Sequence, residues 1–309
     1  MAQTARVFID GEAGTTGLGI RTRLADVAGI ELKSLPDDRR KDPEARRALM
    51  GEVDLVVLCL PDAAARESVA LADSLGARAP KVLDASTAHR VAPGWVYGFA
   101  ELESCQAARI AAARRAVVPG CYATGAISLL RPLVDAGLLA PDYPVTINAV
   151  SGYSGGGKKM IAAHEETGGP AFELYGLGLE HKHLPEIAAY SRLTRRPIFV
   201  PSVGHYRQGM LVSVPLHLDT LPGAPTAAAL EAALQARYAG AQRVRVVAPP
   251  AGGRIEPEAL NDTDNLEVYV CANEAQRQAV LVARLDNLGK GASGAAVQNI
   301  RLMLGLSHG

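Results

Sequence analysis

Apolar positions follow one pattern in the first half of the chain and another in the second half. The candidate strands of the first half are residues 6–10, 30–35, 53–60, 81–86, 96–99 and 116–119. Segments rich in Ala, Arg and Leu separate them, such as 42–51 and 63–76. Strands that alternate with helices are typical of a doubly wound parallel sheet. The run "VDLVVLCL" at 53–60 is apolar nearly throughout, as expected of a strand buried on both faces.

From about residue 145 the strand-like runs become longer, and turns of hairpin length join some of them. These runs are residues 145–154, 196–203, 210–218, 243–248 and 266–288. They predict a second α/β domain with a mixed, largely antiparallel sheet. The last segment, 289–305, is a glycine loop followed by a helix with Val297, Ile300 and Leu304 on one face. We expect this helix to pack on the first domain.

Bulk properties place the chain among globular proteins. A length of 309 residues suggests two domains of ordinary size or one large domain, and 48% hydrophobic residues allow a large core. A formal net charge of zero gives no general attraction to nucleic acid or to an anionic membrane. No run of 18 apolar residues occurs, and no apolar signal segment precedes the first strand. The four cysteines lack disulfide or metal-finger spacing, so we expect a cytoplasmic protein with free thiols.

A glycine motif follows the first strand, in "VFIDGEAGTTGLGIRTRL". Gly11, Gly14 and Gly17 would let the backbone turn tightly and approach a pyrophosphate at the start of the next helix. The spacing is GxxGxxG and not the common GxGxxG, so a plain strand–turn–helix remains an alternative. The position after the first strand of an alternating α/β half favours dinucleotide binding.

The end of the second strand bears on which cofactor is bound. An acid in this region would favour the ribose hydroxyls of NAD, but Ser34 stands at the strand end and Asp37 lies in the following loop. Arg39, Arg40 and Lys41 follow and could meet a 2′-phosphate, although a solvated charged loop is the alternative. This pattern favours NADP over NAD.

Cys121, in "VVPGCYATGA", stands at a turn and not inside an apolar run. A Pro-Gly break precedes it, and a helix is predicted from Tyr122 to about Ala136, closed by Gly137. A thiol at a helix start lies in the positive end of the dipole, which lowers its pKa and favours a nucleophile. A buried structural cysteine is the alternative, and Cys59 and Cys271 fit that description because both lie in strand patterns.

Two further stretches carry polar chemistry. His181 and His183, in "LEHKHLPEIA", could transfer protons for a nucleophile. They could also form half of a metal site, but no third ligand is evident and we predict no metal. The stretch "SGYSGGGKKM" resembles a P-loop, but Lys159 replaces the required Ser or Thr, so we reject an ATPase. Its glycines and lysines could still bind an anionic substrate.

The chain contains seven motifs in this order: "GEAGTTGLG", "DASTAHR", "VVPGCYATGA", "SGYSGGGKK", "EHKHLPEI", "GHYRQGML" and "DNLGKGASGAAVQN". In this order they closely resemble the N-acetyl-gamma-glutamyl-phosphate reductases of arginine biosynthesis, in their shorter subtype, over residues 6–305. The "PGCYAT", "HxHxPEI" and "KGASGAAVQN" stretches are specific, whereas the glycine motif is not. The resemblance implies a Rossmann-type dinucleotide-binding domain at 1–118, completed by 286–309, and a substrate and oligomerisation domain at 119–285.

The resemblance also implies the chemistry. Cys121 would attack an acyl phosphate, N-acetylglutamyl 5-phosphate, and NADPH would reduce the resulting thioester. His183 matches the acid/base position best, with His181 as the second candidate. The expected cofactor contacts are Gly11, Gly14, Thr15, Thr16, Gly17, Ser34, Arg39, Asn287, Lys290, Gly291 and Gly294. The expected substrate contacts are Arg90, Ser151, Ser154, Lys158 and Arg207. A homo-oligomer, either a dimer or a tetramer, is expected.

Three other functions remain open at this point. An aspartate-semialdehyde dehydrogenase would share the chemistry, and the Gly204-His205 pair resembles one found in those enzymes, which makes His205 a rival acid. A cysteine acyltransferase or hydrolase would need no nucleotide and would leave the glycine motif unexplained. A non-enzymatic Rossmann regulator would not need a reactive thiol.

Overall fold

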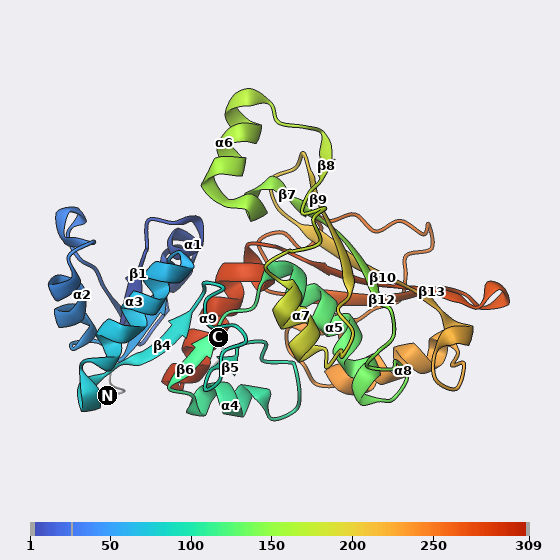
Figure 1. Ribbon diagram of the computed structural model, residues 1–309, viewed down its shortest axis with the longest axis horizontal. Helices are drawn as coiled ribbons and strands as arrows, with labels where there is room; N and C mark the ends of the chain where they lie inside the picture. The colour runs from blue at the N-terminus through green and yellow to red at the C-terminus, as the bar shows by residue number, and fades with distance from the viewer. Residues whose placement is uncertain (1–3, 26, 307–309) are drawn as a thin grey trace. The chain divides into compact units, whose positions relative to one another are not determined.

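The computed structural model describes residues 4–25 and 27–306, which divide into two compact units (Figure 1). The first unit contains the chain up to Ala100, the segment Cys105–Pro119, and the chain from Ala292 onward. The second unit contains Glu101–Ser104 and Gly120–Gly291. The chain therefore enters the second unit twice and returns to the first unit after each entry. The separate roles expected for the two domains stay predictions at this stage.

The first unit is built on a six-stranded sheet of order β2-β1-β3-β4-β6-β5, in which every strand pairing is parallel. Its described strands are β1 (Ala5–Asp10), β2 (Ile30–Lys33), β3 (Leu55–Leu58), β4 (Lys81–Asp84), β5 (Val96–Tyr97) and β6 (Arg115–Val117). The predicted doubly wound parallel sheet is confirmed. The strand order reverses between β1 and β3, which is the place where such sheets bind ligands at their carboxyl edge.

Helices cover both faces of this sheet because successive strand residues point to opposite sides. Val7 and Ile9 of β1 face one hydrophobic cluster, and Phe8 faces the other. The first cluster is completed by α1 (Thr15–Leu24), α4 (Gln106–Ala112) and α9 (Gly294–Leu304). The second is completed by α2 (Pro43–Met50) and α3 (Asp62–Asp73).

The C-terminal helix α9 packs inside this first unit. Val297 and Ile300 are buried in the first cluster, as the helical spacing predicts. The third buried residue in this cluster is Met303, at 2% exposure, and not Leu304, which is only partly buried. Because the real helix turns by about 100° per residue, Met303 lies nearer the centre of the apolar face than Leu304 does.

A buried ion pair ties two of these helices to the central strand. Asp10, at the end of β1, accepts hydrogen bonds from Arg46 at 2.7 and 3.1 Å and from Ser68 at 2.6 Å. Arg46 lies on α2 and Ser68 on α3, so one carboxylate fixes both helices at the carboxyl edge of the sheet. Burial of a charge is tolerated here because the partners satisfy it.

The second unit is built on a seven-stranded sheet of order β11-β12-β13-β10-β7-β9-β8. Its described strands are β7 (Thr146–Gly152), β8 (Phe172–Leu174), β9 (Ile198–Gly204), β10 (Met210–His217), β11 (Val244–Val246), β12 (Leu266–Asn273) and β13 (Gln278–Leu285). The pairs β11–β12 and β7–β9 are parallel and the other described pairs are antiparallel. The predicted mixed, largely antiparallel sheet is confirmed.

The two faces of this second sheet differ. Alternate residues such as Val212 and Leu281 are buried where α5 (Cys121–Asp135) and α8 (Ala227–Tyr238) pack on the sheet, as Figure 1 shows. The opposite face carries apolar side chains that are only partly covered, and a groove of about 550 Å³ lies on it. Val280, in this groove, is 39% exposed.

Several elements of the second unit escaped prediction from sequence. They are β8, α6 (Gly157–Thr167) and α7 (Leu184–Tyr190). The predicted strand at 145–154 ends at Gly152 and continues as a short 3₁₀ turn, since glycines there do not sustain a strand. No helix in the described ranges is both long enough and apolar enough to cross a bilayer.

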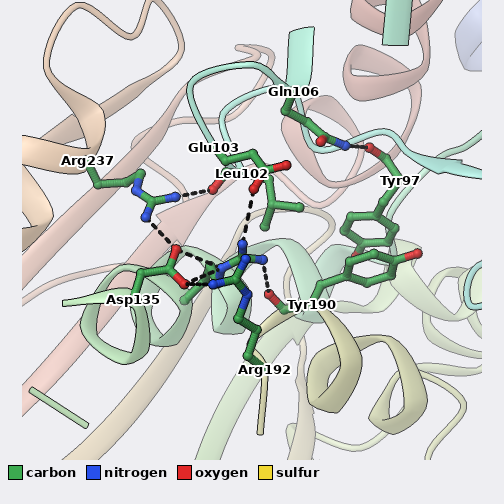
Figure 2. Close-up of polar contacts among 9 residues, drawn as sticks. Tyr97, Leu102, Glu103, Gln106, Asp135, Tyr190, Arg192 and Arg237 are labelled. Atoms are coloured by element: carbon green, nitrogen blue, oxygen red, sulfur yellow. Dashed lines mark hydrogen bonds and ion pairs between the residues drawn. The ribbon is translucent and has the colours of Figure 1, made fainter. Parts of the chain in front are cut away.

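Asp135, at the end of α5, is surrounded by arginines (Figure 2). Arg131 contacts both carboxylate oxygens, at 2.8 and 2.9 Å. Arg192, just after α7, donates at 2.7 Å, and Arg237 of α8 donates at 2.5 Å. Arg237 also donates to the carbonyl of Leu102. One carboxylate therefore joins three helical elements and the short first segment of the second unit.

We expect the Asp135→Asn substitution to destabilise the protein by about 1–3 kcal/mol at pH 7, since it leaves three arginines without their common anion. Burial raises the pKa of Asp135, but hydrogen bonds from Arg237 and Arg131 outweigh it and the pKa is lowered. A lowered folded pKa stabilises the protein above the unfolded pKa near 4, and that stability is lost as the pH falls through the folded value.

Denaturant unfolding of both proteins at pH 7 and pH 3 measures this. The variant should lose less stability than the wild type on acidification. Asp73→Asn serves as a control, because Asp73 pairs with Arg115 at a surface where both side chains are at least 37% exposed. An equal acid response in the wild type and Asp135→Asn would contradict the assignment.

Candidate active site

Cys121 is the first residue of α5, one residue earlier than the sequence predicts. Gly120 caps the helix with extended backbone, at φ −72° and ψ 147°, and its carbonyl accepts from the Thr124 N–H at 2.8 Å. Most of α5 is buried. At Gly125 a Cβ would lie 2.6 Å from Val212, so glycine lets the helix press against β10. The thiol is therefore held at the start of a rigid buried helix.

The backbone after β13 packs directly against this thiol. A Cβ placed on Gly291 would lie 2.8 Å from the Cβ of Cys121. The Gly291 N–H donates to the Asp286 carbonyl at 2.9 Å, which closes the loop. Lys290, only 1% exposed, forms an ion pair with Glu101 at 2.7 Å. Both of these predicted cofactor contacts thus belong to a tightly held loop beside Cys121.

Glu186 connects the second motif to the first and was missed from sequence. Its carboxylate is 1% exposed and accepts the N–H of Gly120 at 3.1 Å. Glu186 lies in the first turn of α7, which begins at Leu184. Pro185 stands in the first turn of α7, where a proline is tolerated because the N–H it lacks would have no partner within the helix.

His181 and His183 lie together next to the residue that follows the thiol. Their ring centroids are 4.7 Å apart, and each lies within 6 Å of the ring of Tyr122. The His183 backbone N–H donates to Nδ1 of His181 at 3.1 Å, so the proton of a neutral His181 ring sits on Nε2. The segment is a turn and not extended, and His183 is the residue preceding α7.

His205, the rival acid, lies at the end of β9 and contacts a different histidine. Its Nδ1 is 2.9 Å from Nδ1 of His164, which is 4% exposed and stacks on Tyr153 at 4.7 Å. His205 is exposed. Its described side-chain contacts are with α6 and Tyr153, while His181 and His183 contact Tyr122.

Several predicted substrate residues come together around Asn287. The Asn287 amide donates to Ser154 at 2.9 Å, and its oxygen accepts the N–H of Gly209 at 2.8 Å. Asn287 therefore clamps the "SGYSGGG" loop against the "GHYRQG" loop. Ser151 and Ser154 are buried, at 1% and 3% exposure. These two hydrogen bonds hold both loops in place. The cofactor contact expected of Asn287 stays a prediction.

The charged residues predicted to contact the substrate differ in exposure and in the unit to which they belong. Lys158 is exposed at the start of α6. Arg207 pairs with Glu165 of the same helix at 2.5 Å. Arg90 belongs to the first unit and is 8% exposed. It follows His89, whose Nδ1 lies 2.6 Å from the fully buried Asp84, so the loop after β4 is anchored by this pair.

The glycine motif fits a dinucleotide at the switch point of the first sheet. Gly11 has φ +90°, and a Cβ there would lie 2.4 Å from the Cys59 carbonyl after β3. At Gly17 a Cβ would lie 2.7 Å from the Gly11 carbonyl. Gly14 caps α1, which begins with Thr15 and Thr16, so helix N–H groups face the carboxyl edge. Gly294 begins α9 in the same unit.

At the end of β2, Ser34 takes part in hydrogen bonds to side chains that the sequence analysis did not connect with it. Ser34 donates to Glu12 at 3.1 Å and accepts from Arg21 at 2.9 Å. Arg39 turns toward Asp42 instead, at 3.2 Å. Glu12 stands inside the glycine motif and Arg21 on the helix after it. Glu12 was missed from sequence. Its position as a charged residue between Gly11 and Gly14 is the signal that could have indicated a role at this edge of the sheet.

The remaining cysteines suit structural roles. Burial, with Asp84 and Asp10 nearby, raises the pKa of Cys59 to about 12. Burial also raises the pKa of Cys271. Both thiols stay protonated at neutral pH and are poor nucleophiles. In the part of the chain that the structure describes, the cysteines form no disulfide and no cluster suited to a metal ion occurs.

Comparison with known proteins identifies the family. The model of the semialdehyde dehydrogenase dimerisation domain matches residues 121–287. N-acetyl-gamma-glutamyl-phosphate reductase of Chelativorans sp. strain BNC1 is 52% identical over 97% of this chain and 98% of its own. The protein of that name from Brucella ovis is 51% identical over 97% of this chain and 99% of its own.

Solved structures share the fold at low identity. Aspartate semialdehyde dehydrogenase II from Vibrio cholerae, complexed with ASA, aligns with a TM-score of 0.70 and 15% identity over 98% of both chains. The Candida albicans aspartate semialdehyde dehydrogenase with NADP aligns with a TM-score of 0.66 and 14% identity, over 97% and 98% of the chains. Because the high identity to the reductases spans nearly the whole length, this chain belongs to the N-acetyl-gamma-glutamyl-phosphate reductase family.

Proposed function

We propose that this protein reduces N-acetyl-L-glutamyl 5-phosphate to N-acetyl-L-glutamate 5-semialdehyde and phosphate, with NADPH, in arginine biosynthesis. The relatives named for this reductase support the substrate. The observation that carries the mechanism is Cys121 at the first position of α5, held by Gly291 and by the Glu186–Gly120 hydrogen bond. These contacts fix one thiol beside two histidines that could move protons.

The first step is acyl transfer to Cys121. The helix start favours the thiolate over the thiol, because the N-terminal end of α5 carries partial positive charge. The thiolate sulfur bonds to the acyl carbon, the bond from that carbon to the phosphate oxygen breaks, and phosphate leaves with the electron pair. N–H groups of the first turn are suited to stabilise the oxyanion that forms between these events.

The second step releases the semialdehyde. NADPH, when bound, would supply the hydride that reduces the thioester carbon. His183 donates a proton to the carbonyl oxygen as charge develops there, and takes it back as the carbon–sulfur bond breaks. His181 is less suited to this role, because its Nδ1 accepts the backbone N–H of His183 and holds the turn in place. Glu186 positions both histidines by joining α7 to the start of α5.

The first unit supplies a site that fits NADP. Gly11, Gly14 and Gly17 would hold the pyrophosphate, with Thr15 and Thr16 at the start of α1. Gly294, at the start of α9 in the same unit, would face the nicotinamide half. The family resemblance also proposes Lys290 and Gly291 for this half, and these two residues belong to the second unit with Cys121. The fit rests on Gly11 and Gly17, where a side chain would collide with backbone atoms. The solved Candida albicans relative, described as bound with NADP, supports the cofactor class.

The substrate residues are divided between buried and exposed groups. Ser151 and Ser154 would contact the acyl phosphate. The Ser154 hydroxyl accepts from Asn287 at 2.9 Å and keeps its own proton for donation, whereas the Ser151 hydroxyl donates to the Gly152 carbonyl at 2.9 Å in this structure. Arg90, Lys158 and Arg207 would supply positive charge to its phosphate or carboxylate groups.

We also propose that the open face of the second sheet binds a second copy of this chain. Phe172, Leu174 and Ile198 are at least half exposed, and Val280 lies in the same region. An apolar face of this kind is costly to leave in water. The matching family model is named for a dimerisation domain. A dimer or a tetramer built on this face would cover it.

The direct test of the function is an assay of phosphate-dependent NADP⁺ reduction by purified protein. N-acetylglutamate semialdehyde should be oxidised at a kcat/KM at least 100-fold above that of aspartate semialdehyde. A preference for aspartate semialdehyde would instead assign the chain to the sister activity.

Cys121→Ser should lose essentially all turnover and still bind NADPH, because a serine hydroxyl is far less nucleophilic at neutral pH. Cys105→Ser is the matched control, since Cys105 is exposed at the start of α4 and should keep full activity. Steady-state assays and NADPH titrations measure both. Appreciable turnover by purified Cys121→Ser would exclude the covalent mechanism.

His183→Asn should lower kcat by about 10²–10⁴-fold with little change in KM, because a general acid acts mainly in the transition state. His181→Asn should raise KM more than it lowers kcat, and His205→Asn should remain near wild type. Steady-state kinetics on the three variants decide among them. A large kcat loss in His205→Asn, with His183→Asn near wild type, would reverse the assignment.

Val280→Asp should shift the protein toward monomers, since it places a charge in the centre of the proposed contact. Leu18→Asp is the control, because Leu18 is 48% exposed on α1, outside the second unit. Light scattering over a range of concentrations gives the mass of each. An unchanged mass for Val280→Asp would argue against this face.

A further inference from the structure

A buried carboxylate organises two arginines and a serine where β2 ends. The Glu12 side chain is 10% exposed and receives three donors. Arg21 donates at 2.7 Å and Ser34 at 3.1 Å to one oxygen. Arg40 lies 2.9 Å from the other oxygen. Arg21 also donates to the Ser34 hydroxyl at 2.9 Å, so the four side chains form one connected cluster.

The inner edges of both guanidinium groups are fixed, and their outer sides face solvent. The side chain of Arg21 is 46% exposed and that of Arg40 is 38% exposed. A guanidinium carries five N–H donors, so each arginine keeps donors beyond those that Glu12 receives. The Nε of Arg40 has no hydrogen-bond partner among the described residues. The cluster is therefore held in shape without being saturated.

The charge of the cluster favours an anion. Two arginines face one buried carboxylate, which leaves an excess of one positive charge at the carboxyl edge of β2. Asp37 pairs with Arg40 at 2.8 Å, but its side chain is 88% exposed. An ion pair of that exposure is weakened by water and salt, so Asp37 opposes the excess only slightly.

We propose that Arg21 and Arg40, held by Glu12 and joined by Ser34, bind the 2′-phosphate of the dinucleotide and set the preference for NADP over NAD. In doubly wound folds the adenosine ribose lies at the carboxyl end of the second strand, where Ser34 stands. The assignment rests on the proposed function and deepens it. It also moves the role away from Arg39, whose guanidinium turns to Asp42, the cap of α2.

Glu12 acts as a positioning residue and not as a ribose ligand. An acid at this place could instead accept the ribose 2′-hydroxyl and select NAD. In this chain both Glu12 oxygens already receive protein donors, and one of them receives two. The carboxylate thus orients the arginines, while their remaining N–H groups are available to a dianion. Planar guanidinium groups suit such recognition of phosphate oxygens.

Isothermal titration of the purified full-length protein with NADP⁺ and with NAD⁺ tests this without any need for turnover. Arg21→Gln and Arg40→Gln should each lower the ratio of NADP⁺ to NAD⁺ affinity about tenfold, by loss of a charge-assisted hydrogen bond. Arg39→Gln, the matched control, should leave the ratio within about twofold. Titration with 2′,5′-ADP against 5′-ADP should show the same changes, which would place the effect at the 2′-phosphate.

The outcomes separate the inference from the proposed function. A wild type that binds NADP⁺ no better than NAD⁺ would overturn the cofactor choice itself. A wild-type preference that survives both Arg21→Gln and Arg40→Gln, or that is lost in Arg39→Gln, would overturn only the inference. Glu12→Gln should leave NAD⁺ affinity unchanged, and a loss of that affinity would identify Glu12 as a ribose ligand. Unchanged 5′-ADP binding shows that each variant is folded. If a Gln variant does not fold, lysine replaces glutamine at the same position.

Discussion

The rest of the site depends on how the start of α5 is held. A helix start exposes N–H groups that need acceptors, and Gly120 finds one in the carboxylate of Glu186, 66 residues later. That single bond places α7, and the histidine turn before it, beside Cys121. Gly291 closes the other side, where any larger residue would collide with the cysteine. Backbone contacts on both sides thus fix the position of Cys121, and the same contacts bring the histidine turn close to it.

Local signals explain which parts of this arrangement could be predicted. Pro119, Gly120 and Gly137 mark the ends of α5 in the sequence, and the structure places the helix within one residue of that estimate. Period-two alternation in β10 and β13 likewise predicts one covered and one open face. These features depend on neighbours along the chain, so the sequence carries them directly.

The contacts that could not be predicted join residues that are distant in sequence. Glu12 meets Ser34 after 22 residues, Asp135 meets Arg237 after 102, and neither pairing has a local pattern. The start of α7 could not be predicted for another reason. A proline usually keeps the preceding residue out of a helix, but α7 begins at Leu184 and needs no earlier turn. Charge alone also could not tell Arg39 from Arg40, since only the direction of each side chain separates them.

The path of the chain has a consequence for how the protein is made. The first unit is interrupted at Pro119 and resumes only at Ala292, and α9 then supplies Val297, Ile300 and Met303 to its core. A ribosome working at about 5–20 residues per second needs roughly 10–35 seconds to cover that interval. During this time one face of the nascent parallel sheet lacks its last helix. The first unit can therefore complete its core only after the second unit has been synthesised.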